Sequence, residues 1–193
     1  MQNPKILVLS GSSRSGSLNT QLAALTCKRL ALADADVSRI SLADYSLPIY
    51  NGDLEEEKGV PENAKKLATL FEKQQGVFIA SPEYNAGVPP LLKNAVDWMS
   101  RVSKADGKTT TAFKEPVFAL GSASPGGFGG VRNMIGFRTV MEFGLGANVL
   151  PEMIILSRAG SAFTDKGDLK DEGVSKQLDT VVAALLDAAR RRM

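Results

Sequence analysis

The chain has 193 residues, a length that suits one α/β domain, and we expect a single domain over residues 1–193. A formal net charge of +2 predicts neither a nucleic-acid partner nor binding to a membrane surface. The absence of histidine excludes a Ser-His-Asp triad and argues against a metal site. The single cysteine, Cys27, excludes an internal disulfide and predicts a cytoplasmic location.

Apolar runs of strand length alternate along the chain with segments of helical periodicity. The expected strands are residues 5–10, 36–42, 76–81, 116–122 and 149–156. The expected helices are residues 18–32, 62–75, 89–101, 131–143 and 171–191. Strands separated by helices pair in parallel, which predicts a three-layer α/β sandwich with strand order 2-1-3-4-5. Segments 51–59, 103–114 and 158–170 are polar and are expected to be exposed loops.

The segment Gly-Ser-Ser-Arg-Ser-Gly-Ser-Leu-Asn, residues 11–19, joins the first expected strand to the first expected helix. The main-chain N–H groups of such a loop converge, and the start of the following helix favours negative charge. Four serine hydroxyls and the guanidinium of Arg14 add hydrogen-bond donors. The segment therefore predicts a phosphate site, with a loop that merely turns the chain as the alternative.

Two other phosphate-binding motifs differ from this loop. Gly11 and Gly16 have the glycine spacing of a triphosphate-binding loop, but Ser17 and Leu18 stand where that motif needs lysine and a hydroxyl residue. Ser13 interrupts the glycine pattern of a dinucleotide site. A terminal monophosphate bound without a metal ion fits the loop best.

Two further loops follow expected strands at the same edge of the sheet. Residues 81–90 carry three prolines that stiffen the segment and Gly87, which permits a sharp bend. Such a loop can present main-chain N–H groups and the amide of Asn85 to a planar heterocycle. Residues 122–130 contain four glycines and follow the fourth expected strand, and a purely structural glycine loop is one interpretation of them.

The first two motifs together resemble the NADPH-dependent FMN reductase family, most closely its bacterial chromate, quinone and azo dye reductases. The second motif is Ser-Pro-Glu-Tyr-Asn-Ala-Gly-Val-Pro-Pro-Leu-Leu-Lys-Asn-Ala-Val-Asp-Trp, residues 81–98, and it is highly specific. The resemblance covers nearly the whole chain in order and spacing, and it implies a flavodoxin-like fold with a crevice between the first and third strands.

The resemblance also implies a set of cofactor-binding residues and no catalytic side chain, because FMN carries the chemistry. The FMN phosphate would be bound by Ser12, Arg14, Ser17, Leu18 and Asn19. The isoalloxazine ring would lie beside Pro82, Glu83, Tyr84 and Asn85. The far side of the ring would be closed by Ser122, Gly126 and Gly127.

As an enzyme of this family, the chain would transfer hydride from NADPH or NADH to FMN and pass two electrons to a quinone, an azo compound, chromate or free flavin. The choice between NADPH and NADH stays open. Relatives assemble as homodimers or homotetramers, and the apolar stretch 134–145 either serves that assembly or belongs to the core. An electron-carrying flavodoxin is one alternative, disfavoured because flavodoxins are usually strongly acidic. A non-catalytic FMN-dependent sensor is the other.

Two side chains in or near the second motif have competing interpretations. Trp98 is expected in the core or at a subunit interface, with contact to the flavin as the alternative. Glu83 is expected to act through its backbone, with general-base catalysis as the alternative.

Overall fold

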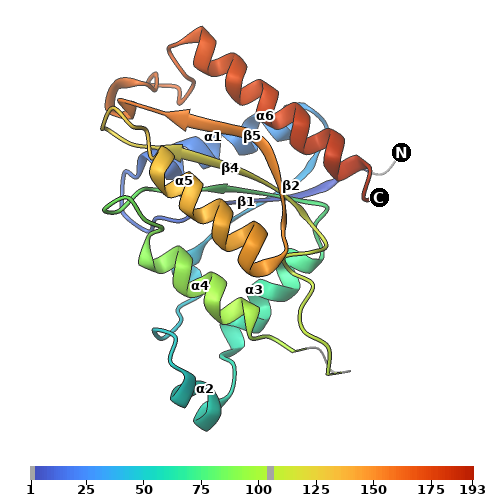
Figure 1. Ribbon diagram of the computed structural model, residues 1–193. Coiled ribbons are helices and arrows are strands. Elements are labelled where there is room, and N and C mark those ends of the chain that lie inside the picture. Colours follow the sequence, from blue (N-terminus) through green and yellow to red (C-terminus); the bar gives the residue numbers. More distant parts are fainter. Residues whose placement is uncertain (1–2, 104–106) are drawn as a thin grey trace.

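The computed structural model describes residues 3–103 and 107–193, and its strands form one parallel sheet in the order β2-β1-β3-β4-β5 (Figure 1). The strands are β1 (Lys5–Ser10), β2 (Asp36–Ser41), β3 (Gly76–Ala80), β4 (Val117–Ala123) and β5 (Asn148–Leu156). The helices are α1 (Leu18–Leu32), α2 (Gly52–Lys58), α3 (Glu62–Glu72), α4 (Pro90–Ser100), α5 (Val131–Arg138) and α6 (Glu172–Arg190). The expected fold class and strand order are confirmed, and element ends differ from the expected ones by a few residues.

Helices cover both faces of the sheet, with α1 and α6 on one face and α3, α4 and α5 on the other (Figure 1). Side chains of β1 alternate between the two layers, so that Ile6 and Val8 pack toward α1 and α6, while Leu7 and Leu9 pack toward α3 and α4. All four are fully buried. This burial on both faces explains why the central strands appear in the sequence as continuous apolar runs.

The expectation of an exposed loop over residues 51–59 is wrong, because most of it forms the short helix α2. Asn51 caps the start of α2 by accepting a hydrogen bond from the N–H of Asp53. Gly59 ends it with a φ of 72°, a left-handed conformation that glycine adopts readily. Both signals stand in the sequence, but the helix buries no side chain, so it lacks the apolar periodicity on which the prediction relied.

The expected loop over residues 103–114 lies in part outside the described residues, namely at 104–106. Residues 107–109 are exposed, as expected, but Ala112 and Phe113 are buried. The ring of Phe113 stacks on that of Phe118 with centroids 6.4 Å apart and meets Phe71 edge-on. A core contact therefore interrupts a segment whose polar composition predicted a surface loop.

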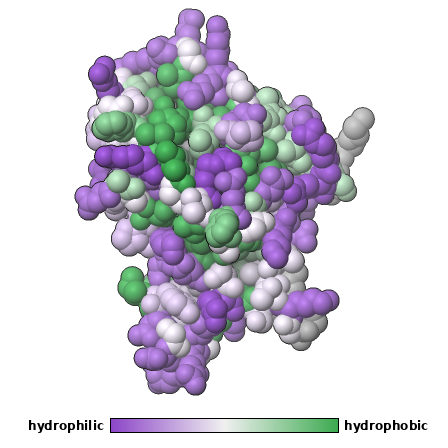
Figure 2. Space-filling model, viewed as in Figure 1, coloured by the Kyte–Doolittle hydropathy of each residue, from purple (hydrophilic) through white to green (hydrophobic). Residues whose placement is uncertain are grey.

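Beyond Arg138, a π-helical segment, Thr139–Gly144, continues α5. Figure 2 shows apolar side chains between polar ones on the face that carries α5 and β5. Phe128, Ile135 and Phe143 are large apolar residues exposed in this part of the chain, and Phe143 is 92 % exposed. None of the helices that the structure describes is long and apolar enough to cross a membrane.

Candidate functional site

The loop of residues 11–17 begins where β1 ends, and it passes close to the neighbouring strand. The N–H of Gly11 donates to the carbonyl oxygen of Ala80 at 2.8 Å, which extends the pairing of β1 with β3 by one residue. A Cβ at Gly11 would lie 3.0 Å from the side chain of Leu92, so only glycine fits here without displacing that leucine. The loop then reverses at Gly16, where φ is +66°, and Ser17 caps α1 by accepting from the N–H of Thr20.

Two hydrogen bonds shape the loop from within. Ser10 Oγ accepts from the N–H of Ser12 at 3.2 Å, and Ser12 Oγ accepts from the N–H of Arg14 at 3.3 Å. Several other main-chain N–H groups of this segment donate to no acceptor in the described part of the chain, namely those of Ser13, Ser15, Gly16, Leu18 and Asn19. Unpaired donors in a loop that opens a helix suit a phosphate. We call residues 11–19 the phosphate cradle.

Arg14 and Asn19 contribute to the cradle in different ways. The guanidinium of Arg14 is exposed and reaches only Ser15 within the loop, at 3.4 Å from its carbonyl oxygen. The side chain of Asn19 is buried, with Nδ2 2.8 Å from the carbonyl oxygen of Ala123 and Oδ1 2.9 Å from the N–H of the same residue. Asn19 therefore fastens α1 to the end of β4, and only its main-chain N–H is available to a ligand.

The Pro-Glu-Tyr-Asn motif leads into a reverse turn, Tyr84–Gly87, whose two central residues are Asn85 and Ala86. The N–H groups of Tyr84 and Gly87 donate to each other's carbonyl oxygens at 3.1 and 3.0 Å. Between them, Asn85 and Ala86 have φ angles of 51° and 64°. Positive φ at both central residues is typical of a type I′ turn, in which asparagine is favoured and alanine is strained. The turn holds Tyr84 half-exposed at its start.

The carboxylate of Glu83 anchors this turn to α5. Its Oε1 accepts from Arg132, at 2.9 Å from Nε and with a second bond from Nη2, and its Oε2 accepts from the N–H of Asn133 at 3.2 Å. The Glu83 side chain is only 7 % exposed. Burial raises the pKa of this carboxyl, but the hydrogen bonds from Arg132 and Asn133 outweigh burial, and the pKa lies below its ordinary value.

Sequence reasoning missed Arg132 and Asn133. Both lie in the first turn of α5, directly after the glycine loop, and the topology brings that helix start next to the Glu83 turn. The amide Nδ2 of Asn133 donates to Ser81 Oγ at 2.9 Å and to the carbonyl oxygen of Pro82 at 2.8 Å. The signal available in the sequence was a pair of polar residues at the start of a helix that follows a parallel strand.

Ser122 of β4 packs against the glycine loop at Gly130. Gly130 has a φ of +92°, and a Cβ there would lie 1.9 Å from Ser122 Oγ. Ser122 Oγ and Asn133 Oδ1 are buried without a hydrogen-bond partner among the described residues. The loop therefore closes so tightly over β4 that no side chain is possible at Gly130.

Most of the predicted site residues line one hollow between the cradle, the turn and the end of β4. Ser12, Arg14, Ser17, Leu18, Asn19, Pro82, Glu83 and Tyr84 belong to its lining, together with Ala123, Ser124 and Pro125. Asn85, Ser122, Gly126 and Gly127 lie outside that lining. The hollow encloses about 110 Å³, less than the roughly 300–1,000 Å³ of sites that enclose a whole ligand, so a flavin ring would lie on an open rim.

Trp98 lies in the core, as expected. It is fully buried, and its Nε1 donates to the carbonyl oxygen of Pro48 at 2.7 Å. The edge of its ring meets Tyr50 with centroids 5.0 Å apart. Its indole therefore helps to attach the segment before α2 to α4.

Comparison with known proteins identifies the family. The family model for NADPH-dependent FMN reductase matches residues 4–161. The chain is 32 % identical over 190 residues to the quinone reductase of Escherichia coli (97 % of this chain, 96 % of that one). It is 34 % identical over 190 residues to an NAD(P)H-dependent FMN reductase of Pseudomonas aeruginosa, with the same coverage.

A solved structure agrees with these matches. The flavoenzyme NAD(P)H:(acceptor) oxidoreductase FerB from Paracoccus denitrificans superimposes with a TM-score of 0.75 and 26 % identity, covering 98 % of each chain. The phosphate cradle, the anchored turn and the sheet order are thus found in a chain that matches named flavin reductases along nearly its whole length. This chain belongs to the NADPH-dependent FMN reductase family and is an oxidoreductase that uses FMN as cofactor and NAD(P)H as co-substrate.

Proposed function

We propose that the chain binds FMN with its phosphate in the cradle and its ring beside the Pro82–Tyr84 segment, and that it reduces quinones. The observation that carries this proposal is the set of unpaired N–H groups in the cradle, which opens into the same hollow as that segment. When bound, FMN supplies a ring that accepts hydride from NAD(P)H and delivers two electrons to an acceptor. The protein supplies binding, orientation and electrostatics.

The cradle binds the phosphate through main-chain donors. The N–H groups of Leu18 and Asn19 point out of the first turn of α1, where no carbonyl of the helix can pair with them. Ser12 and Ser17 add hydroxyls, and Arg14 adds a charge that is free to turn toward the ligand because it is exposed. The negative phosphate also interacts favourably with the positive end of α1.

Glu83 acts as an anchor and not as a proton acceptor. Its lowered pKa keeps the carboxyl ionised at neutral pH, and three donated hydrogen bonds from Arg132 and Asn133 occupy its oxygens. A carboxylate so engaged is a weak base. Its effect is to fix the turn, so that Pro82 and Tyr84 present a constant edge to the ring, while Asn85 at the tip of the turn stays outside the hollow.

The far side of the ring would face the loop after β4. Ser124 and Pro125 line the hollow directly, whereas Gly126 and Gly127 continue the same loop beyond it. Ser122 supports this loop from the sheet and has no surface of its own to offer a ligand, since it is fully buried. We therefore assign ring contact to residues 124–127 and support to Ser122.

Quinones are the acceptors best supported, because relatives that match nearly the full chain are named quinone reductases. An open rim is tolerant of shape, and on this ground we extend the proposal to azo compounds, chromate and free flavin as slower acceptors. We further propose a homodimer or homotetramer. Phe128, Ile135 and Phe143 are exposed on and around α5, where a second copy would cover them.

A single experiment tests the proposed activity. Purified protein is saturated with FMN, its visible absorption is recorded, and NADPH is added without oxygen. We expect the absorption of the oxidised flavin to bleach and then to return in full on addition of a benzoquinone, with sustained NADPH consumption when the quinone is in excess. Protein that binds no FMN would overturn the proposal. If NADPH bleaches the flavin but added quinone causes no further consumption of NADPH, the result favours an electron carrier over a quinone reductase.

A further inference from the structure

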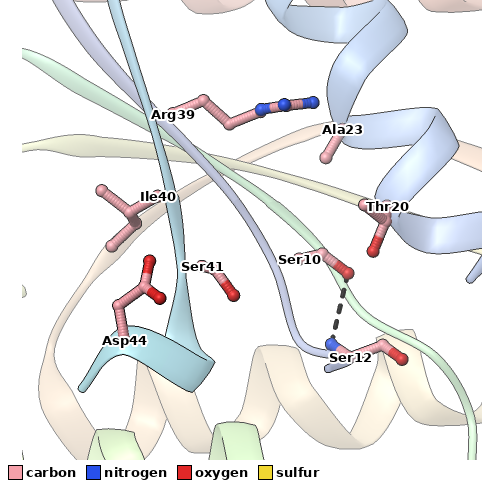
Figure 3. Close-up of a pocket in the computed structure, with 8 residues that line it drawn as sticks. All are labelled: Ser10, Ser12, Thr20, Ala23, Arg39, Ile40, Ser41 and Asp44. Atoms are coloured by element: carbon pink, nitrogen blue, oxygen red, sulfur yellow. Dashed lines mark hydrogen bonds between the residues drawn. The ribbon is translucent and has the colours of Figure 1, made fainter. Parts of the chain in front are cut away.

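A second hollow lies next to the phosphate cradle, over the carboxyl ends of β1 and β2 and beside α1 (Figure 3). It encloses about 270 Å³, more than the hollow of the cradle. Its polar lining consists of Ser10, Ser12, Thr20, Arg39, Ser41 and Asp44. Ser12 belongs to the lining of both hollows, so they meet at that residue.

Arg39 brings to this hollow a positive charge that forms no ion pair among the described residues. Its side chain extends from β2 across the hollow toward α1 (Figure 3). Within residues 3–103 and 107–193, no acceptor hydrogen-bonds to its guanidinium and no carboxylate pairs with it. A guanidinium with its five donors free in a concavity suits a phosphate or the face of a planar base.

Asp44 stands at the other side of the hollow, on the short helical turn Leu42–Asp44 that follows β2. A carboxylate can only accept hydrogen bonds. The two adjacent hydroxyls of a ribose are spaced so that both can donate to its oxygens. Arg39 and Asp44 both line this hollow of about 270 Å³, so a phosphate at the first and a sugar at the second would belong to one ligand.

Hydroxyl groups line the space between these two charges. Ser10 Oγ accepts from the N–H of Ser12, and Ser41 Oγ accepts from the N–H of Ala43 at 3.2 Å, which leaves both hydroxyl protons available to a ligand. Ser10 is buried at 7 % exposure. A buried hydroxyl with a free proton, a free guanidinium and a carboxylate in one hollow form a set of groups that matches a nucleoside phosphate.

We propose that this hollow binds the adenosine-phosphate half of a dinucleotide. The proposal rests on the proposed FMN site, because the shared Ser12 lets one ligand extend from the cradle into the second hollow. Two sources carry this chemistry: FAD, whose flavin half would occupy the FMN site, and NAD(P)H, whose adenosine half would lie here. Arg39 receives the phosphate, and Asp44 receives the ribose hydroxyls.

The direct test uses AMP as the probe on the full chain saturated with FMN, measured by calorimetry. We expect AMP to bind, Arg39→Ala to weaken it about tenfold and Asp44→Asn to weaken it several-fold. Arg191→Ala is the charge-matched control, since Arg191 pairs with Asp187 on α6, and it should leave AMP binding unchanged. FMN affinity should be the same in all variants. AMP that fails to bind, or that binds Arg39→Ala as tightly as the unaltered chain, overturns the proposal.

A second measurement distinguishes FAD from NAD(P)H as the ligand that places its adenosine-phosphate half in the second hollow. If FAD is the ligand, Arg39→Ala lowers the affinity for FAD about tenfold and spares that for FMN. If the ligand is the reduced pyridine nucleotide, the variant raises the KM for NADPH or NADH and spares both flavins. A variant that changes neither quantity overturns the proposal. Failure of the unaltered chain to bind FMN would instead overturn the proposed function, so the two failures are distinguishable.

Discussion

The phosphate cradle and the segment Pro82–Tyr84, which leads into the Tyr84–Gly87 turn, face one hollow but are built in different ways. The middle of the cradle is shaped by contacts within the loop, from Ser12 to Ser10 and from Arg14 to Ser12, each spanning two residues. Within the described ranges, only its two ends, Gly11 and Asn19, are tied to distant strands. The turn depends on Arg132 and Asn133, which lie 49 and 50 residues after Glu83. The phosphate-facing middle of the cradle is therefore local, whereas the turn is a product of the packed fold.

This difference predicts how the two regions respond to substitution. In the part of the chain that the structure describes, the guanidinium of Arg14 hydrogen-bonds only within its own loop, so its loss should change ligand affinity and leave the fold intact. Glu83, Asn133 and Gly130 are held by distant elements, so their substitution should change stability as well.

Gly130→Ala should lower the free energy of unfolding by about 3 kcal/mol, from overpacking against Ser122 together with a left-handed backbone. The added Cβ would lie 1.9 Å from Ser122 Oγ at a φ of +92°. Gly127→Ala is the matched control: it meets no atom within 4 Å and should change stability by less than about 0.5 kcal/mol. Urea unfolding measures both, and equal values for the two variants would show that the glycine loop is not held by β4.

Arg14→Ala should weaken FMN binding by about 2 kcal/mol, the value of a hydrogen bond to a charged group, which is a roughly thirtyfold rise in Kd. Flavin fluorescence titration measures the Kd, and thermal unfolding of the FMN-free protein should be unaltered because the guanidinium reaches only Ser15. Arg191→Ala serves as the control of equal charge. An unchanged Kd would remove Arg14 from the cofactor site.

Glu83→Gln should lower the free energy of unfolding by about 1.5 kcal/mol at neutral pH, because a charge-assisted pair with Arg132 is replaced by a neutral one. The native pKa of Glu83 is lowered. Its ionised form therefore contributes stability above the ordinary pKa of about 4.5, and that contribution is lost as the pH falls through the lower native value.

The stability difference between Glu83→Gln and the unaltered chain should accordingly shrink as the pH drops below about 4.5. Urea unfolding at several pH values measures this difference. Glu57→Gln is the control, since Glu57 is exposed on α2 and, among the described residues, pairs with Lys58 alone, at 4.0 Å. A difference that stays constant with pH would mean that the carboxylate charge does not hold the turn.

Ala86→Gly should raise the free energy of unfolding by about 0.5 kcal/mol, since relief of a left-handed alanine exceeds the entropy cost of glycine. Ala86 has a φ of 64°. Ala183→Gly in the exposed face of α6 is the control and should act in the opposite direction, by about 0.5–1 kcal/mol. Two variants that destabilise equally would show that the turn is not strained at Ala86.

The fold was predictable because its signals are local. The strands appear as buried apolar runs such as Lys5–Ser10, and the helices between them force parallel pairing. The errors arose where local composition and burial disagree. Helix α2 buries nothing and so has no apolar period, and Phe113 sits in a polar segment yet packs on Phe118.

The candidate site was predictable in its position and less so in its roles. Cradle and turn residues were named from two motifs, and eight of them line the hollow. The role of Asn19 was not predictable, because its amide pairs with Ala123, which lies 104 residues away. Arg132 and Asn133 were missed for the same reason, since nothing near them in the sequence indicates a carboxylate partner.

The amino-acid sequence alone determined the order of strands and helices, the edge of the sheet at which the ligand loops gather, and the family motifs. These features depend on hydrophobic period, glycine spacing and helix starts, which act over a few residues. The tertiary structure alone decided the anchoring of Glu83 by α5, the packing of Ser122 against the glycine loop and the second hollow, which Arg39 helps to line. Such contacts join groups far apart in the chain, so they exist only once packing has brought those groups together.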